Sequence, residues 1–90
     1  MSENPKVKSV RPLANRHLLV DFTNGASKDY DCNQLIHLPA FEILKNDSFF
    51  KQVKADAGGY GISWNADVDL SEYEIWTNGR DLSEKTVTVL

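Results

Sequence analysis

The chain has 90 residues, of which 41% are hydrophobic and 26% are charged, and its formal net charge is −3. A chain of this length forms one domain with a small stability margin. No apolar run approaches the roughly 20 residues that cross a bilayer, the N-terminus has no apolar signal core, and the single cysteine excludes an internal disulfide or a cysteine-rich zinc site, so we expect a cytoplasmic protein.

The charge is unevenly distributed along the chain. Residues 1–20 contain four basic side chains against Glu3, a local charge of +3, whereas residues 56–84 contain seven acidic side chains against Arg80, a local charge of −6. Nucleic-acid-binding proteins usually carry a basic footprint, so the acidic C-terminal half argues against that class. It favours a cationic partner, although charges of this kind also serve only to keep a domain soluble.

The first predicted strand is Val7–Arg11. Pro12 is expected to end it, because proline has no backbone N–H to donate to a sheet. The next three residues, 14–16, are expected to turn the chain.

His17–Thr23 has the clearest strand pattern, with apolar and polar residues at period two. Asn24-Gly25 predicts a hairpin turn, and residues 26–31 return antiparallel. A two-residue turn would place Asp21 opposite Lys28, a favourable pair of opposite charges. A bulge or a longer turn is the alternative.

The middle of the chain predicts short helical turns. Asp31 or Asn33 is expected to cap a turn over 32–37, Pro39 to open a helix through Lys45, and Asn46 to precede a further turn that ends in two phenylalanines. Residues 51–56 are predicted to be a strand.

The C-terminal part begins with Gly58-Gly59, which predicts a turn into a strand over Tyr60–Trp64. Residues 67–71 are expected to run as a loop into the last helix. There Ser71 and Glu74 have the spacing of a capping box, and Asn78-Gly79 predicts a left-handed C-cap.

These elements together predict an α+β fold, with a mainly antiparallel sheet of about five strands and two or three short helices on one side. We expect residues 1–80 to form the single compact domain. Residues 81–90 are expected to be a tail that adds a strand, pairs with another copy or hangs free.

The chain resembles the domain-of-unknown-function 2442 family of small bacterial proteins over roughly residues 6–80, through the order and spacing of several motifs together. The motifs are Val7–Leu13, Val20–Gly25, Asp47–Phe50, Gly58–Asn65, Val68–Ser71 and Glu74–Gly79. Many members have Trp-Pro-Asn-Gly-Ala-Asp where this chain has the shorter Trp64-Asn65-Ala66-Asp67.

The resemblance implies an α+β fold with a mainly antiparallel sheet and no established enzymatic activity. Some members are fused to a helix-turn-helix, and many are encoded beside another small protein in what look like toxin–antitoxin pairs. It therefore implies an antitoxin-like role in binding a partner. No segment after Gly79 is long enough for a helix-turn-helix, which argues against direct operator binding.

Asp67 and Asp69 are the candidate acid/base or metal-binding pair, with His17 as an additional group. Two carboxylates two residues apart on an extended loop can share a cation, but Mg²⁺ and Ca²⁺ sites take more oxygen ligands than this loop offers. The structural alternative is that Asp69 or Ser71 caps the helix and Asp67 braces the loop.

Other candidate groups have ordinary structural explanations. His17 and His37 lack the further ligands of a zinc site, and Cys32 has no recognisable activating base. The glycines after residue 57 lack the lysine of a phosphate-binding loop. We expect no catalytic residue, no cofactor and no bound metal.

The preferred function is a non-catalytic protein-interaction module, antitoxin-like, that binds a small partner through its acidic C-terminal half. Most aromatic residues are expected in the core, with Trp76 as the exposed exception. The predicted partner-binding residues are Asn65, Asp67, Glu72 and Trp76. The alternatives are a metal- or ligand-binding domain or enzyme that uses Asp67 and Asp69, and a DNA-associated regulator; a homodimer is also left open.

Overall fold

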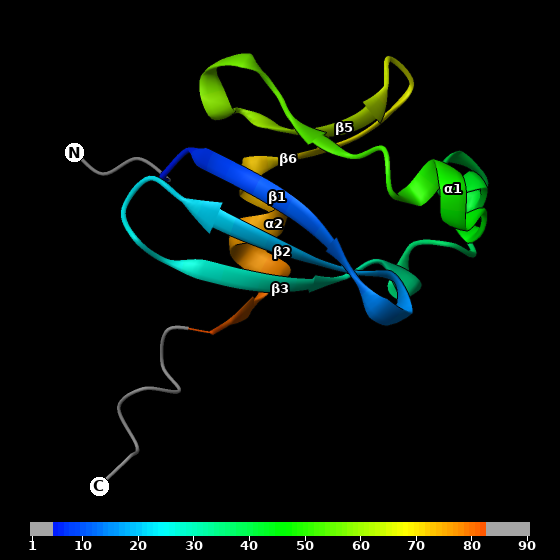
Figure 1. The fold of residues 1–90 in the computed structure, drawn as a ribbon, viewed down its shortest axis with the longest axis horizontal. Coiled ribbons are helices and arrows are strands. Elements are labelled where there is room, and N and C mark those ends of the chain that lie inside the picture. The colour runs from blue at the N-terminus through cyan, green and yellow to red at the C-terminus, as the bar shows by residue number, and fades with distance from the viewer. Residues whose placement is uncertain (1–4, 83–90) are drawn as a thin grey trace, which may run out of the picture.

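The computed structural model describes residues 5–82 and contains two antiparallel sheets, one of four strands in the order β1-β2-β3-β7 and one of three in the order β4-β5-β6 (Figure 1). The strands are β1 (Val7–Leu13), β2 (His17–Phe22), β3 (Ser27–Asp31), β4 (Lys54–Ala55), β5 (Gly61–Asn65), β6 (Val68–Ser71) and β7 (Arg80–Asp81). The α-helices are α1 (Asp47–Phe50) and α2 (Glu72–Asn78), and 3-10 turns cover Ala14–Arg16, Cys32–Gln34, Pro39–Lys45 and Ala57–Gly59. This is the α+β class that the sequence predicts, but with two sheets in place of one.

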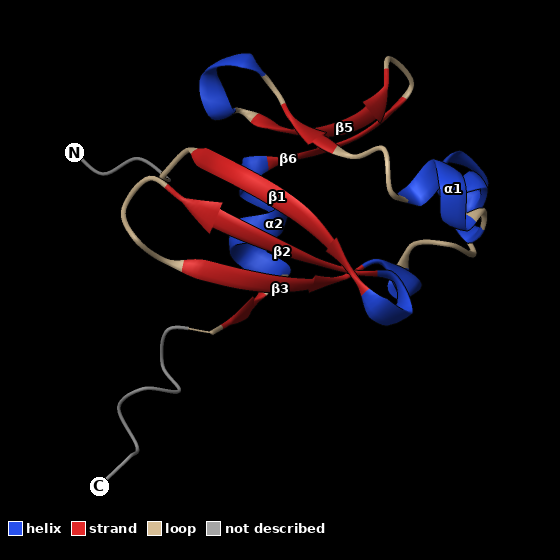
Figure 2. Ribbon diagram, viewed as in Figure 1, coloured by secondary structure: helices blue, strands red, loops and turns tan. Residues whose placement is uncertain are grey.

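The smaller sheet lies alongside the larger one, and α2 covers the back of the larger sheet (Figure 2). The core forms where these elements meet. Its fully buried members include Leu18, Val20 and Tyr30 from the larger sheet, Ile62 from the smaller one and Ile75 from α2. Every buried side-chain nitrogen or oxygen in the described residues has a hydrogen-bond partner, so the packing leaves none of those polar atoms stranded.

The register between β2 and β3 differs from the predicted one by one residue. Val20 pairs with Lys28 and Asp21 with Ser27, because the loop is longer than two residues and closes with the Phe22 N–H donating to the Ala26 carbonyl. The longer turn is the alternative that the sequence left open. A one-residue shift exchanges the faces of a strand, and here it turns Tyr30 into the core.

Strand β1 continues through Pro12 to Leu13, so the prediction that Pro12 ends the strand is wrong. Proline is tolerated because β1 is an edge strand that pairs only with β2. The turn that follows holds Asn15 and Arg16 at φ of 62° and 63°, in the left-handed region that non-glycine residues rarely adopt.

Two strands of the smaller sheet differ from the prediction. The predicted strand over 51–56 is reduced to Lys54–Ala55. Strand β6 occupies Val68–Ser71, where the sequence predicted a loop. In β6, Val68 and Leu70 are buried and the residues between and after them are exposed, which is the period-two pattern of a half-buried strand.

Helix α2 begins with half of the predicted capping box. The Ser71 hydroxyl accepts from the Glu74 N–H at 3.0 Å, as predicted. The Glu74 carboxylate, however, accepts from the Tyr30 hydroxyl at 2.8 Å and from the Asn78 amide at 3.0 Å. The box is therefore open, and Glu74 instead ties the helix to the larger sheet.

The predicted left-handed C-cap at Gly79 is wrong, because its φ is −76°. Glycine is required there by close approach. A Cβ at this position would lie 2.6 Å from the Ile75 carbonyl oxygen and 3.0 Å from Cβ of Lys28. After Gly79 the chain enters β7, which pairs with β3.

The Leu82 N–H donates to the Ser27 carbonyl and extends this pairing by one bond. The predicted tail strand falls mostly on residues 83–90, outside the described part of the chain. Within the described part, no helix is long and apolar enough to cross a membrane.

Candidate functional site

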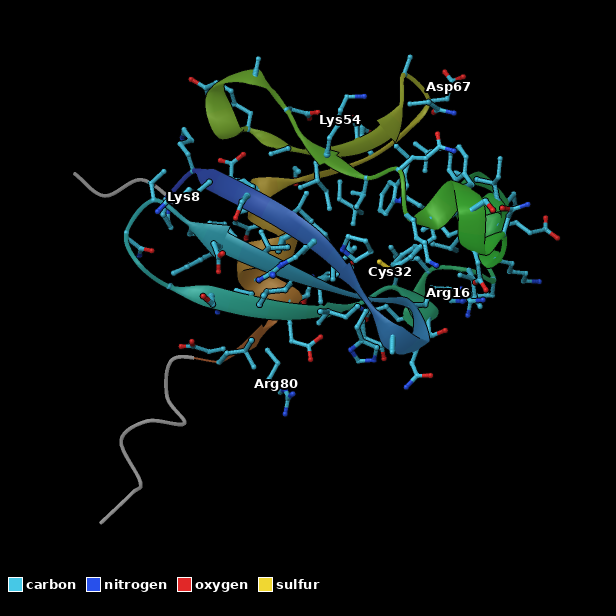
Figure 3. All side chains as sticks on the ribbon, viewed as in Figure 1. Lys8, Arg16, Cys32, Lys54, Asp67 and Arg80 are labelled. Carbon is cyan, nitrogen blue, oxygen red and sulfur yellow. The ribbon has the colours of Figure 1, made fainter. Side chains whose placement is uncertain are left out.

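The outward side of the smaller sheet is the principal candidate surface. Lys54, Ser63 and Asp69 are paired across β4, β5 and β6, and they point away from the core because Ile62 and Leu70 of the neighbouring row are buried. Asp56 accepts from the Ser63 hydroxyl at 2.7 Å. Figure 3 shows Lys54 and Asp67 on the side of this sheet that is turned away from the larger sheet. We call this surface, with the β5–β6 turn, the acidic face.

The β5–β6 turn is fixed by the side chain of Asn65. Its amide oxygen accepts from the Asp67 N–H at 2.8 Å and from the Val68 N–H at 2.9 Å. Asn65 therefore braces the loop, and the Asp67 carboxylate is left exposed. Neither Asp67 nor Asp69 has a side-chain hydrogen bond or ion pair within residues 5–82, so both charges are available to a partner.

Three other carboxylates of the acidic segment have partners inside the protein. Asp56 is bonded to Ser63, and Glu74 is bonded to Tyr30. Glu72 lies 3.8 Å from the Lys6 ammonium, and its side chain is only 17% exposed. Among residues 5–82, the carboxylates left unengaged in the predicted acidic surface are therefore Asp67 and Asp69, and Glu72 acts mainly as an internal ion-pair partner.

Trp64 lies in the core as expected, but the prediction that Trp76 is the exposed aromatic residue is wrong. Trp64 is 3% exposed and donates its Nε1–H to the Phe50 carbonyl. Trp76 is partly buried, with its ring edge-on to Phe22 at 5.1 Å between centroids. Instead, Tyr60 and Tyr73 are each 63% exposed.

The sequence does contain a signal for one of the two exposed tyrosines, Tyr73. Tyr60 directly follows two glycines and precedes β5, and Tyr73 lies in the first turn of α2, two residues before the buried Ile75. In a helix, residues two apart do not share a face. Such a spacing predicts an exposed Tyr73 once Ile75 is identified as core.

The two tyrosines are held near each other at one end of the smaller sheet. The Glu72 N–H donates to the Tyr60 carbonyl at 2.9 Å, and the Lys6 ammonium lies 4.8 Å from the centre of the Tyr60 ring. Tyr73 follows Glu72 directly in α2.

The four predicted partner-binding residues do not form one cluster. Asn65 and Asp67 lie at the turn before β6, whereas Glu72 and Trp76 lie beyond its other end. The four residues of β6 separate the two pairs by about 13 Å at roughly 3.3 Å per residue.

The candidate catalytic and metal-binding groups are placed as follows. No three or more His, Cys, Asp or Glu side chains in the described chain are grouped to hold a metal ion. His37 is exposed in a loop. Cys32 is fully buried, and burial together with the Asp31 carboxylate raises the pKa of its thiol to about 12. That thiol is structural, as the sequence indicated, because the thiolate is the reactive form.

A hollow of about 500 Å³ lies beside the β1–β2 turn, lined by Pro12, Leu13, Ala14, Asn15, Arg16, Asp47, Phe50 and Lys51. Its arginine is committed to the fold. Nε of Arg16 donates to the Leu44 carbonyl and Nη1 to the Asn33 side chain, both at 3.1 Å. The Arg16 guanidinium beside the hollow is therefore held by hydrogen bonds within the protein.

Comparison with known proteins identifies the family of the chain. No curated protein and no solved structure matches the chain. A family model described as "Protein of unknown function (DUF2442)" matches residues 7–81, from the first residue of β1 to the last of β7. The chain therefore belongs to the DUF2442 family.

Proposed function

We propose that this protein is a non-catalytic interaction module that binds a small basic protein through the acidic face and the two exposed tyrosines at the other end of the smaller sheet. The observation that carries the proposal is the exposure of two unengaged carboxylates, Asp67 and Asp69, together with that of Tyr60 and Tyr73, each 63% exposed. The other carboxylates named in the acidic face and helix have internal partners.

The two kinds of residue supply different parts of the binding energy. Tyrosines offer large rigid contact area at a low entropy cost and are frequent anchors of protein interfaces. Unpaired carboxylates steer a cationic partner and fix its orientation more than they add affinity. Binding of this kind weakens with salt, because exposed charges are screened over about 8 Å at physiological ionic strength.

The finer proposal is an antitoxin-like role in the cytoplasm. The partner is then a small protein encoded by the adjacent gene, and the module inhibits it by covering its working surface. The segment charge of residues 56–84, −6, and the exposed tyrosines support this proposal.

The experiment is co-purification of the chain with the product of the adjacent gene, followed by calorimetric titration of the two purified proteins. We expect a complex at micromolar concentration that weakens as salt is raised. A mixture that shows no complex at micromolar concentration would overturn the proposal.

A pair of charge reversals locates the surface. Asp67→Lys with Asp69→Lys is expected to weaken the complex at least tenfold. Glu42→Lys is the matched control, because Glu42 is exposed in the Pro39–Lys45 turn. Equal weakening by the double variant and by the control would place the interface elsewhere.

A further inference from the structure

Strand β6 has an open edge that joins the two groups of residues used by the proposed function. In the described part of the chain, β6 pairs only with β5, so its other side lies at the edge of the smaller sheet. Asp67 immediately precedes the strand, and β6 leads directly into α2, where Tyr73 is the second residue (Figure 1). The edge therefore runs for about 13 Å from the carboxylates to the tyrosines.

Two hydrogen bonds show which backbone groups of β6 face its neighbour. The Val68 N–H donates to the Asn65 side chain, and the Glu72 N–H donates to the Tyr60 carbonyl, both at 2.9 Å. Asn65 belongs to β5 and Tyr60 directly precedes it. Along an antiparallel strand, residues that bond to the neighbour alternate with residues that do not. The backbone of residues 68, 70 and 72 therefore faces β5.

The residues between these, Asp69 and Ser71, direct their N–H groups to the open edge. Both residues are exposed. Within residues 5–82, no turn, cap or loop supplies a partner for either N–H or for the Asp69 carbonyl. Unpaired backbone groups on an edge strand are a template for pairing with another chain. Three such groups are available here.

The side chains of β6 determine which strand fits this edge. Val68 and Leu70 point towards the core and are 6% and 7% exposed, whereas Asp69 points outward. Side chains that lie directly opposite each other on paired strands share a face and interact. A strand added to β6 would therefore place basic side chains beside Asp69 and apolar side chains beside Leu70, at alternate positions.

A second copy of this chain fits the edge less well than a basic strand does. Antiparallel pairing of two β6 strands would bring Asp67 and Asp69 of one copy beside the same carboxylates of the other. Like charges on facing strands are destabilising, and charged side chains on an edge strand commonly prevent self-pairing. Charge complementarity therefore selects a basic segment as the occupant.

We propose that β6 accepts an extended segment of the basic partner as an additional strand of the smaller sheet. The segment alternates Lys or Arg with apolar residues. In strand addition of this kind, backbone hydrogen bonds supply affinity and the alternating side chains supply specificity. This binding mode rests on the proposed function. It lets one segment contact both the carboxylates and the tyrosines, because four extended residues span about 13 Å.

The test compares Asp69→Pro with Asp69→Asn in calorimetric titrations with the product of the adjacent gene. Both variants remove the carboxylate, but only proline removes the N–H, and an edge strand tolerates proline where its N–H faces solvent. Asp69→Asn is expected to weaken the complex about two- to fivefold, the usual contribution of an exposed ion pair. Asp69→Pro is expected to weaken it by roughly a further tenfold, because a partner carbonyl loses its donor.

Hydrogen exchange in the original chain tests the same contact without a substitution. In the free chain, the amides of Asp69 and Ser71 are expected to exchange rapidly. In the complex with the product of the adjacent gene, both should exchange at least tenfold more slowly. The Leu70 amide faces β5 in both states, so it is the internal control and is expected to be protected throughout.

Three results would overturn strand addition and leave the proposed function in place. One is a complex of equal strength with Asp69→Pro and Asp69→Asn. Another is exchange at Asp69 and Ser71 that is as fast in the complex as in the free chain. The last is a dimer of the original chain that Asp69→Pro dissociates, because a second copy then occupies the edge. If the original chain forms no complex at all, the proposed function and strand addition are both wrong.

Discussion

Replacing Tyr30 by phenylalanine isolates the hydrogen bond that ties α2 to the larger sheet. Tyr30 is fully buried, and its hydroxyl donates to the Glu74 carboxylate at 2.8 Å. Burial, together with that carboxylate, raises the pKa of the Tyr30 phenol, so the hydroxyl remains a donor throughout the accessible pH range. The substitution keeps the ring and removes only this bond.

The loss of stability expected for Tyr30→Phe depends on the charge of the hydrogen-bond acceptor, the Glu74 carboxylate. A hydrogen bond to a charged group contributes about 1.5–3 kcal/mol to stability. Glu74 retains a second donor in Asn78 at 3.0 Å, so we expect a loss at the lower end, about 1.5 kcal/mol. For a chain of this size that is a fall in melting temperature of roughly 6–12 °C.

The assay is urea unfolding followed by tryptophan fluorescence, with Tyr73→Phe as the matched control. Tyr73 is 63% exposed, and an exposed substitution of this kind changes stability by about 0.5 kcal/mol or less. A double-mutant cycle with Glu74→Gln measures the coupling directly. If Tyr30→Phe costs no more than Tyr73→Phe, the hydrogen bond does not hold the helix and this reasoning is refuted.

Three further predictions use other contacts. Gly79→Ala is expected to lower the free energy of unfolding by about 1–3 kcal/mol, because the added methyl group overpacks against Ile75 and Lys28. The φ of Gly79, −76°, would by itself predict a small gain in stability. A fall in the melting temperature would show that overpacking dominates, and a rise would contradict this prediction. Hydrogen bonds from Ser27 and then Ser9 lower the pKa of Asp21 in the folded protein. The stability that Asp21 contributes is therefore present above its unfolded pKa of about 3.9 and is lost as the pH falls through its folded pKa. The difference in stability between the original chain and Asp21→Asn should shrink on acidification, and a difference that stays constant would contradict this prediction. Cys32, whose thiol pKa is raised to about 12, should react with a thiol reagent in urea but not in the folded protein, and rapid labelling of the folded chain would show that it is accessible.

Strands β1, β2 and β3 of the larger sheet could be predicted because their pattern is local, whereas the two-residue strand β7 could not. The period-two alternation of β2 and the Asn24-Gly25 turn are visible in a few consecutive residues. Strand β6 could not be separated from the helix start that follows it, because it has four residues and ends at the N-cap, Ser71. The division into two sheets depends on contacts that no local pattern reports.

The β2–β3 register explains why the contacts of His17 with Asp29 and Asp31 could not be predicted. A two-residue turn would turn Asp29 to the opposite face from His17, next to Val20. The longer loop shifts the pairing by one residue, and Asp29 and Asp31 then share a face with His17. One loop residue therefore decides whether a histidine has two carboxylate neighbours.

The acidic surface could be predicted in part. The exposed carboxylates Asp67 and Asp69 are visible as charges in the sequence, but their unengaged state depends on Asn65 bracing the turn. Trp76 was the expected exposed aromatic residue, and its contact with Phe22 could not be predicted because it joins residues far apart in the chain. That contact leaves the tyrosines as the exposed aromatic anchors.

The most direct test of the proposed function is a titration of the isotope-labelled chain with the product of the adjacent gene, followed by the backbone amide resonances. The account predicts that shifts concentrate at Asp67 and Asp69 and at the amides of Tyr60 and Tyr73, and that the shifts diminish with added salt. Shifts confined to β1, β2 and β3, with the β5–β6 turn unchanged, would contradict it.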